Sequence, residues 1–119
     1  MSALYESAQT NAGGYRDILP AQLAVLGREA RIIDVRESDE FAGELGHIRG
    51  AELVPLATVA AAAKSWRCDD EVVVVCRSGG RSGRAAAALA AIGYGRVMNM
   101  VGGMLAWNEA HLPVERSPS

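Results

Sequence analysis

The stretch Glu71-Val-Val-Val-Val-Cys-Arg-Ser-Gly-Gly-Arg-Ser-Gly-Arg84 indicates both the fold and the chemistry of this chain. Its unbroken run Val72–Val75 is β-branched, short and preceded by charged residues. Such a run is typical of a strand that is buried on both faces, as in a parallel sheet covered by helices. Cys76 follows at the carboxyl end of this strand, which is the edge where ligands bind in open α/β sheets.

A tight turn and a helix are predicted directly after the cysteine. The glycines of Ser78–Gly80 allow the backbone to curl with positive φ angles. Ser82 is expected to cap a helix that runs through 85–92, and Gly93 is a natural residue for its end. This order of elements places a thiol at the mouth of a ring of backbone N–H groups.

The predicted loop has the properties of an anion-binding site. Successive amides in a tight turn form a concave nest, and the following helix contributes the positive end of its dipole. Arg77, Arg81 and Arg84 add formal positive charge around the same point. Because these groups favour the thiolate, which is the reactive form of cysteine, we expect Cys76 to perform nucleophilic sulfur chemistry on anions.

Four motifs lie along the chain at Ile32–Arg36, Gly46–Ala51, Cys76–Ser82 and Met100–Trp107. In this order they resemble motifs of the rhodanese (thiosulfate sulfurtransferase) family. Cys76–Ser82 resembles its active-site loop, and together the motifs cover roughly residues 15–112. Ile32–Arg36 resembles a family strand that ends in Asp-x-Arg. Gly46–Ala51, preceded by Glu40-Phe41, resembles the Gly-His-Ile-x-Gly-Ala signature, and Met100–Trp107 resembles the closing Gly-Gly-x-x-x-Trp helix.

Strands and helices alternate along the sequence, which predicts an α/β domain with a parallel sheet and helices on both faces. The resemblance implies a single rhodanese-like domain with five mostly parallel strands. We place this domain at residues 15–112. Residues 1–14 are expected to be a mobile lead-in or, alternatively, a helix that packs on a neighbouring element, and residues 113–119 a C-terminal tail.

The candidate site residues fall into three groups. Cys76 is the predicted nucleophile, and two charged residues after an earlier strand, Asp34 and Arg36, are expected to form an ion pair that fixes the loop. Ser82 is a further supporting residue. The predicted substrate-binding residues are Arg77, Ser78, Gly79, Gly80 and Arg81.

Three other polar or aromatic residues receive structural interpretations. His47 lies in a glycine-rich turn and is predicted to be a hydrogen-bonded structural histidine, while Trp107 is predicted to anchor the last helix by burial. Glu40 departs from some two-domain rhodaneses, which carry a cation near this position. The electrostatic attraction of a substrate is therefore expected to depend on Arg77 and Arg81.

Bulk properties restrict the class of protein. A chain of 119 residues is large enough for one domain with a core, and its formal charge of −2 argues against nonspecific nucleic-acid binding. No apolar run approaches the roughly 20 residues of a membrane span, and no secretory signal is recognisable, so we expect a cytoplasmic protein.

The two cysteines are not expected to form a disulfide, and no metal or organic cofactor is predicted. Cys68 and Cys76 flank a predicted extended strand, whereas a disulfide needs Cα atoms within about 7 Å. The chain has no Cys-x-x-Cys motif, and His47 and His111 are far apart in sequence.

The resemblance implies a sulfurtransferase that moves sulfane sulfur from thiosulfate or a persulfide to a thiol, or to cyanide in vitro, through a Cys76 persulfide. A protein could be the physiological acceptor, and the chain could act as a monomer or a homodimer. One alternative is a sulfur carrier or partner-binding module with little free turnover. Another is a cysteine phosphatase or arsenate reductase, but loops of that type place arginine six positions after the nucleophile, where this chain has Ser82.

Overall fold

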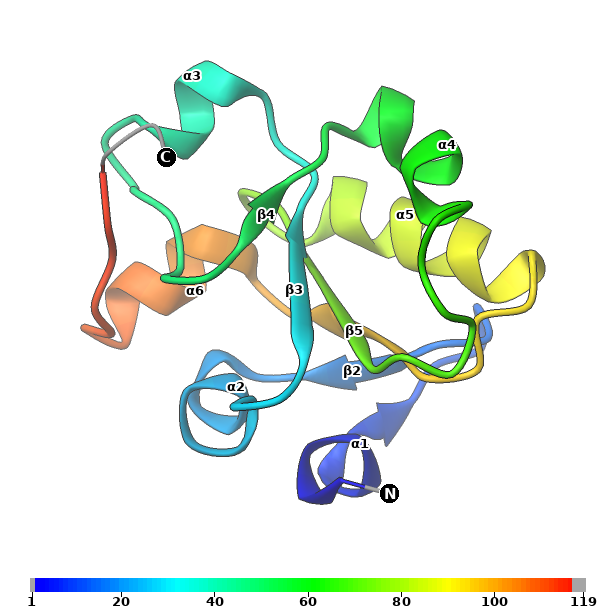
Figure 1. Ribbon diagram of the computed structural model, residues 1–119. Coiled ribbons are helices and arrows are strands. Elements are labelled where there is room, and N and C mark those ends of the chain that lie inside the picture. The colour runs from blue at the N-terminus through cyan, green and yellow to red at the C-terminus, as the bar shows by residue number, and fades with distance from the viewer. Residues whose placement is uncertain (1, 117–119) are drawn as a thin grey trace.

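The computed structural model describes residues 2–116, and within them six strands form one sheet (Figure 1). The strand order is β1-β2-β6-β5-β3-β4, with β1 antiparallel to β2 and every other pair parallel. The strands are β1 (Gln9–Thr10), β2 (Arg16–Ile18), β3 (Arg31–Asp34), β4 (Glu52–Leu53), β5 (Val72–Val75) and β6 (Val97–Met100).

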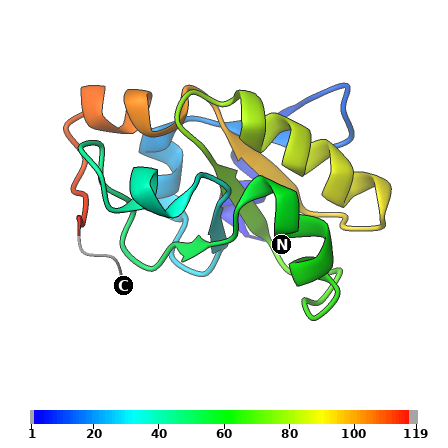
Figure 2. The same cartoon turned by 90° about the horizontal axis from the view of Figure 1, so that it is seen from above.

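Helices cover both faces of this sheet, as Figures 1 and 2 show. The helices α4 and α5 pack on one face, and α1, α2 and α6 pack on the other. Among residues 2–116, no helix is both long and apolar enough to span a membrane. The helical segments are α1 (Ala3–Ser7), α2 (Pro20–Leu26), α3 (Ser38–Phe41), the 3₁₀ turn η1 (Leu56–Thr58), α4 (Val59–Ala63), α5 (Gly80–Ala91) and α6 (Gly103–Glu109).

The strand β5 is central and contributes to both cores. All four of its valines are fully buried, and it pairs in parallel with β3 on one side and β6 on the other. Because side chains alternate along a strand, Val72 and Val74 pack beneath α4 and α5, whereas Val73 and Val75 pack against the opposite helices. Full burial of a valine side chain contributes about 1.5–3 kcal/mol, so this strand is a major source of stability.

The predicted α/β class and mostly parallel sheet are confirmed, but the sheet has one strand more than expected. The additional strand is β1, which pairs outside β2 through Gln9↔Asp17 and Thr10↔Arg16. This strand consists of two exposed polar residues, so it has no hydrophobic alternation by which it could be recognised in the sequence.

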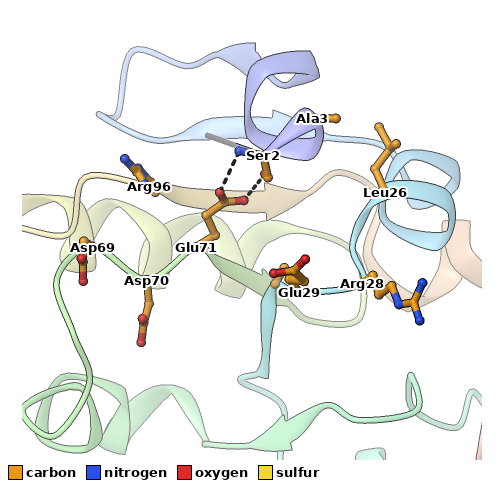
Figure 3. A pocket seen from close by; sticks show the side chains of 10 residues that line it. Ser2, Ala3, Leu26, Arg28, Glu29, Asp69, Asp70, Glu71 and Arg96 are labelled. Carbon is orange, nitrogen blue, oxygen red and sulfur yellow. Dashed lines mark hydrogen bonds between the residues drawn. The ribbon is translucent and has the colours of Figure 1, made fainter.

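The described part of the segment before Gly14 contains α1 and β1 and packs on the domain. Leu4 of α1 is 1% exposed within the core on the α2–α6 face. Ser2 caps α1 by accepting a hydrogen bond from the Tyr5 amide (3.2 Å). It also donates from its amide and hydroxyl to the Glu71 carboxylate, as Figure 3 shows.

A hollow of about 550 Å³ lies at the amino end of β5. Figure 3 shows the side chains that line it. Acidic residues Glu29, Asp69, Asp70 and Glu71 contribute to its lining. Because Cys76 follows the carboxyl end of β5, this hollow lies at the opposite edge of the sheet from the predicted nucleophile.

The tail is attached to the domain as far as the structure describes it. His47 and Glu115 exchange backbone hydrogen bonds (2.7 and 2.8 Å), and the Trp107 indole donates to the carbonyl of Pro113 (3.0 Å). The last three residues of the predicted tail, 117–119, lie outside the described residues.

We expect Leu4→Ala to lower the free energy of unfolding by about 2–5 kcal/mol, because it leaves a cavity in a packed core. Val25→Ala in α2 is the matched control, since Val25 is 78% exposed and its truncation should change stability by less than about 0.5 kcal/mol. Urea denaturation of both variants measures the difference. Equal stabilities of the two variants would mean that α1 contributes little to the fold.

Candidate active site

Cys76 lies where β5 ends, and its sulfur is held by groups from the following loop and helix. The side chain is 1% exposed. Its Sγ accepts a hydrogen bond from the Gly79 amide (3.0 Å), and the Ser82 hydroxyl lies 3.3 Å away. The predicted arrangement of a thiol facing backbone N–H groups is therefore present.

The surroundings of Cys76 favour its thiolate. Burial raises the pKa of the Cys76 thiol, but hydrogen bonds from the Ser82 hydroxyl and from the amides of Ser82, Gly79 and Ser78 outweigh burial and lower the pKa below its ordinary value. A lower pKa increases the fraction of thiolate near neutral pH, and the thiolate is the nucleophilic form.

The turn after Cys76 depends on Gly79. Gly79 has φ of 106° and forms the N-cap of α5, so the helix begins at Gly80, earlier than predicted. Ser82 is consequently not the capping residue. It lies in the first turn of α5 with 0% exposure, and its hydroxyl points to the sulfur.

The start of α6 supports the same loop from its other side. The amide of Met104 donates to the carbonyl of Cys76 (2.8 Å), and that of Leu105 donates to the carbonyl of Arg77 (3.0 Å). Gly103 allows this approach, because a Cβ there would stand 2.4 Å from the Cys76 carbonyl oxygen. Its φ of 59° also lies in the left-handed region.

The two arginines predicted to bind an anion have different surroundings. Arg81 forms a two-pronged ion pair with Glu40 (2.7 and 2.8 Å). Its hydrogen bond lowers the pKa of Glu40 to about 2, so this carboxylate is ionised at neutral pH. The charge of Arg81 is thus already balanced, whereas Arg77 is exposed and forms no ion pair with any other residue in 2–116.

Asp34 and Arg36 form the buried ion pair that the sequence suggested. Both are 1% exposed, and the guanidinium donates to both carboxylate oxygens of Asp34 (2.8–3.2 Å). It also donates to the carbonyls of Glu40 (3.2 Å) and Gly46 (2.7 Å). The pair therefore fixes the segment that carries Glu40, the partner of Arg81.

A cleft of about 250 Å³ lies between this segment and the cysteine loop. His47 supports the segment from within, because it is stacked on Phe41 (ring centroids 3.7 Å apart) and its Nδ1 is 2.9 Å from the Phe41 carbonyl oxygen. The residues that line the cleft are Arg36, Asp39, Glu40, Gly43, Glu44, Leu45 and Arg77.

The sequence interpretation missed the role of Asn99 in β6. This side chain is 7% exposed, and its Oδ1 lies 2.5 Å from the hydroxyl of Ser82. A single amide within the apolar strand Val97–Met100 was the available signal, since a buried polar side chain requires partners.

Comparison with known families fits this geometry. The profile of the family described as rhodanese-like domain matches residues 19–110. The chain belongs to the rhodanese-like family. A rhodanese-related protein of Thermoplasma volcanium has a similar structure, with a TM-score of 0.79 and 28% identity, over 87% of this chain and 100% of that one.

Curated relatives of this rhodanese-like chain include sulfurtransferases. A protein named sulfurtransferase from Allochromatium vinosum is 39% identical over 83 residues, covering 70% of this chain and 76% of its own. The thiosulfate sulfurtransferase GlpE of Vibrio cholerae is 30% identical over 101 residues, covering 85% and 93%. The uncharacterized protein YqhL of Bacillus subtilis is 41% identical over 80 residues; the match covers 67% of this chain and spans only 62% of the length of YqhL.

We expect Gly103→Ala to lower the free energy of unfolding by at least about 1–3 kcal/mol, because the new Cβ must displace the Cys76 loop. Gly95→Ala is the control: no atom lies within 4 Å of a Cβ there, and Gly95 does not have a positive φ. Thermal unfolding measures stability, and the alkylation rate of Cys76 reports whether the conformation of its loop has changed. Unchanged stability and alkylation in Gly103→Ala would show that the loop tolerates displacement.

Proposed function

We propose that this protein transfers sulfane sulfur from thiosulfate, or from a persulfide, to a thiophilic acceptor through a persulfide on Cys76. The observation that carries the proposal is the position of the Cys76 sulfur. It lies at the carboxyl edge of the sheet and accepts a hydrogen bond from the Gly79 amide (3.0 Å). The same loop that lowers its pKa presents amides to charge on a transferred sulfur.

The reaction divides into two displacements. The Cys76 thiolate attacks the outer sulfur of thiosulfate, the sulfur–sulfur bond of the donor breaks, and sulfite leaves with the bonding electron pair. Cyanide or a thiolate then attacks the outer sulfur of the persulfide, and the Cys76 thiolate is regenerated. Both steps balance without a redox partner, and covalent catalysis of this kind gives ping-pong kinetics.

The loop favours a sulfur anion over a phosphate or arsenate ester. A phosphatase loop would need an arginine at the position of Ser82, whose side chain here faces the sulfur. The arginine one residue earlier, Arg81, is paired with Glu40. A tetrahedral oxyanion would therefore find loop amides but no free guanidinium at that position, which supports the sulfurtransferase over this alternative.

A sulfur carrier with one dedicated partner protein is the second candidate function. The exposed Arg77 beside Cys76 suits contact with a partner as well as with a small anion. A carrier would load sulfur on Cys76 but turn over slowly until its partner was supplied, so kinetics separate the two functions.

Incubation with thiosulfate should add the mass of one sulfur atom to the peptide that contains Cys76, because the thiolate takes the outer sulfur. Cyanide should then remove that mass and release thiocyanate over many turnovers. Mass spectrometry and a thiocyanate assay measure the two steps. Absence of a sulfur adduct with thiosulfate, polysulfide and mercaptopyruvate would contradict the proposal, and loading without turnover would favour the carrier.

The cysteines provide the matched pair of variants for this experiment. Both thiols are free, but Cys68 is exposed and precedes β5, whereas Cys76 is buried at its other end. Cys76→Ser should abolish loading and turnover, and Cys68→Ser should leave both nearly intact. Loss of activity in folded Cys68→Ser protein would mean that a second thiol takes part.

We expect Arg77→Ala to raise KM for thiosulfate several-fold, since it removes the exposed cation beside the loop. Glu40→Gln should lower KM for thiosulfate, because it releases the guanidinium of Arg81 from its partner. An uncharged sulfur donor is the control, since its KM should change little in either variant. Raised salt should weaken thiosulfate use, because exposed charges are screened over about 8 Å at physiological ionic strength. Equal changes for both donors would show that these charges do not select anions.

A further inference from the structure

The hydroxyl of Ser82 has more acceptors than it has protons. Its Oγ lies 3.3 Å from Sγ of Cys76, 3.2 Å from the carbonyl oxygen of Gly79 and 2.5 Å from Oδ1 of Asn99. A serine hydroxyl donates one hydrogen bond and accepts two. At any moment it can therefore donate to the sulfur or to the amide of Asn99, but not to both.

The shortest of these contacts determines where the proton lies. Two oxygens 2.5 Å apart require a proton between them, so Ser82 donates to Asn99 when the amide has this orientation. The hydrogen bond from Ser82 to the sulfur, which lowers the pKa of Cys76, then belongs to the thiolate state. A lone pair of Oγ then faces the sulfur and can accept the S–H of neutral Cys76. In this state the Cys76 thiol donates to Ser82 Oγ and the Ser82 hydroxyl donates to Asn99 Oδ1, so both protons have an acceptor.

The thiolate requires the opposite direction of donation. Once the proton of Cys76 has left to solvent, Ser82 must turn its own proton toward the sulfur. Its Oγ then needs a donor on the far side, which the Nδ2 group of Asn99 supplies if the amide reverses. Nδ2 forms no hydrogen bond with another residue in 2–116, so the reversal breaks no such bond.

We propose that Asn99 is a positioning residue, whose amide reverses so that Ser82 serves the neutral thiol of Cys76 in one state and its thiolate or persulfide in the other. An asparagine suits this role because its amide has an acceptor and a donor in nearly the same shape. Aspartate can only accept, and alanine does neither. The inference rests on Cys76 being the nucleophile of the proposed function.

Other groups around the sulfur stay the same when Asn99 is changed. They are the exposed Arg77, the Arg81–Glu40 pair of α5 and α3, and the Asp34–Arg36 pair at the end of β3. The strand β6 and the first turn of α6 contain no charged residue that could act on the sulfur. A change in the titration of Cys76 in Asn99 variants therefore reports on Asn99 itself and on the route through Ser82.

The test is the pH dependence of Cys76 alkylation by iodoacetamide in the full chain carrying Cys68→Ser. Asn99→Ala should raise the pKa of Cys76 by roughly 0.5–1 unit, because the thiolate loses the donor behind Ser82. Asn99→Asp should raise it further, because an acceptor-only side chain keeps the Ser82 proton away from the sulfur. Met98→Leu, a neighbouring buried change of similar volume, should leave the pKa unchanged.

A double-mutant comparison separates the route through Ser82 from simple charge repulsion. With Ser82→Ala as background, Asn99→Asp should raise the pKa clearly less than it does with Ser82 present. An equal rise in both backgrounds would overturn the inference, as would a fall or no change in Asn99→Ala. If Asn99→Asp fails to fold by circular dichroism, the sign of the Asn99→Ala shift decides.

Alkylation needs no sulfur donor, so this test is independent of the proposed reaction. Failure of Cys76 to load sulfur would overturn the proposed function. The pH dependence of Cys76 alkylation would still test the role of Asn99. Conversely, normal sulfur loading with unshifted profiles would overturn the role of Asn99 alone.

Discussion

The close contact between the start of α6 and the cysteine loop is the constraint on which the site depends. Two amides of α6 bind the carbonyls of Cys76 and Arg77, and only a residue without a side chain fits at Gly103. With those carbonyls held from behind, the amide of Gly79 on the other side of the loop can face the sulfur. The surroundings of the thiol therefore depend on packing between segments that are 28 residues apart in the chain, as Cys76 and Met104 are.

Ion pairs arrange the front of the site in a similar way. The buried pair Asp34–Arg36 fixes the chain at Glu40, and Glu40 in turn neutralises Arg81. Removal of one partner of a buried ion pair leaves an uncompensated charge, which makes such pairs strong determinants of geometry. Because Glu40 balances Arg81, the positive charge available beside the cysteine loop is smaller than its arginines suggest, and the exposed Arg77 contributes to it.

The hydrogen bonds behind the sulfur extend the site into the sheet. Ser82 connects Cys76 to Asn99, a residue of the neighbouring strand β6 that is buried among apolar side chains. A buried polar side chain is costly unless its partners are in place, so a network of this kind specifies one arrangement of the loop. It also links the cysteine loop to the strand that leads into Gly102 and Gly103.

The sequence by itself determined the α/β class, the buried valine strand, the thiol at its carboxyl end and the Asp34–Arg36 pair, because periodicity, glycines and short-range charge are local features. It did not determine β1 and α1, the pairing of Glu40 with Arg81, the place of Ser82 inside α5, or the contact of Asn99. Each of these joins segments that are distant in sequence or too short to have a pattern. Only the tertiary structure brings them together, since packing and desolvation select which polar groups become partners.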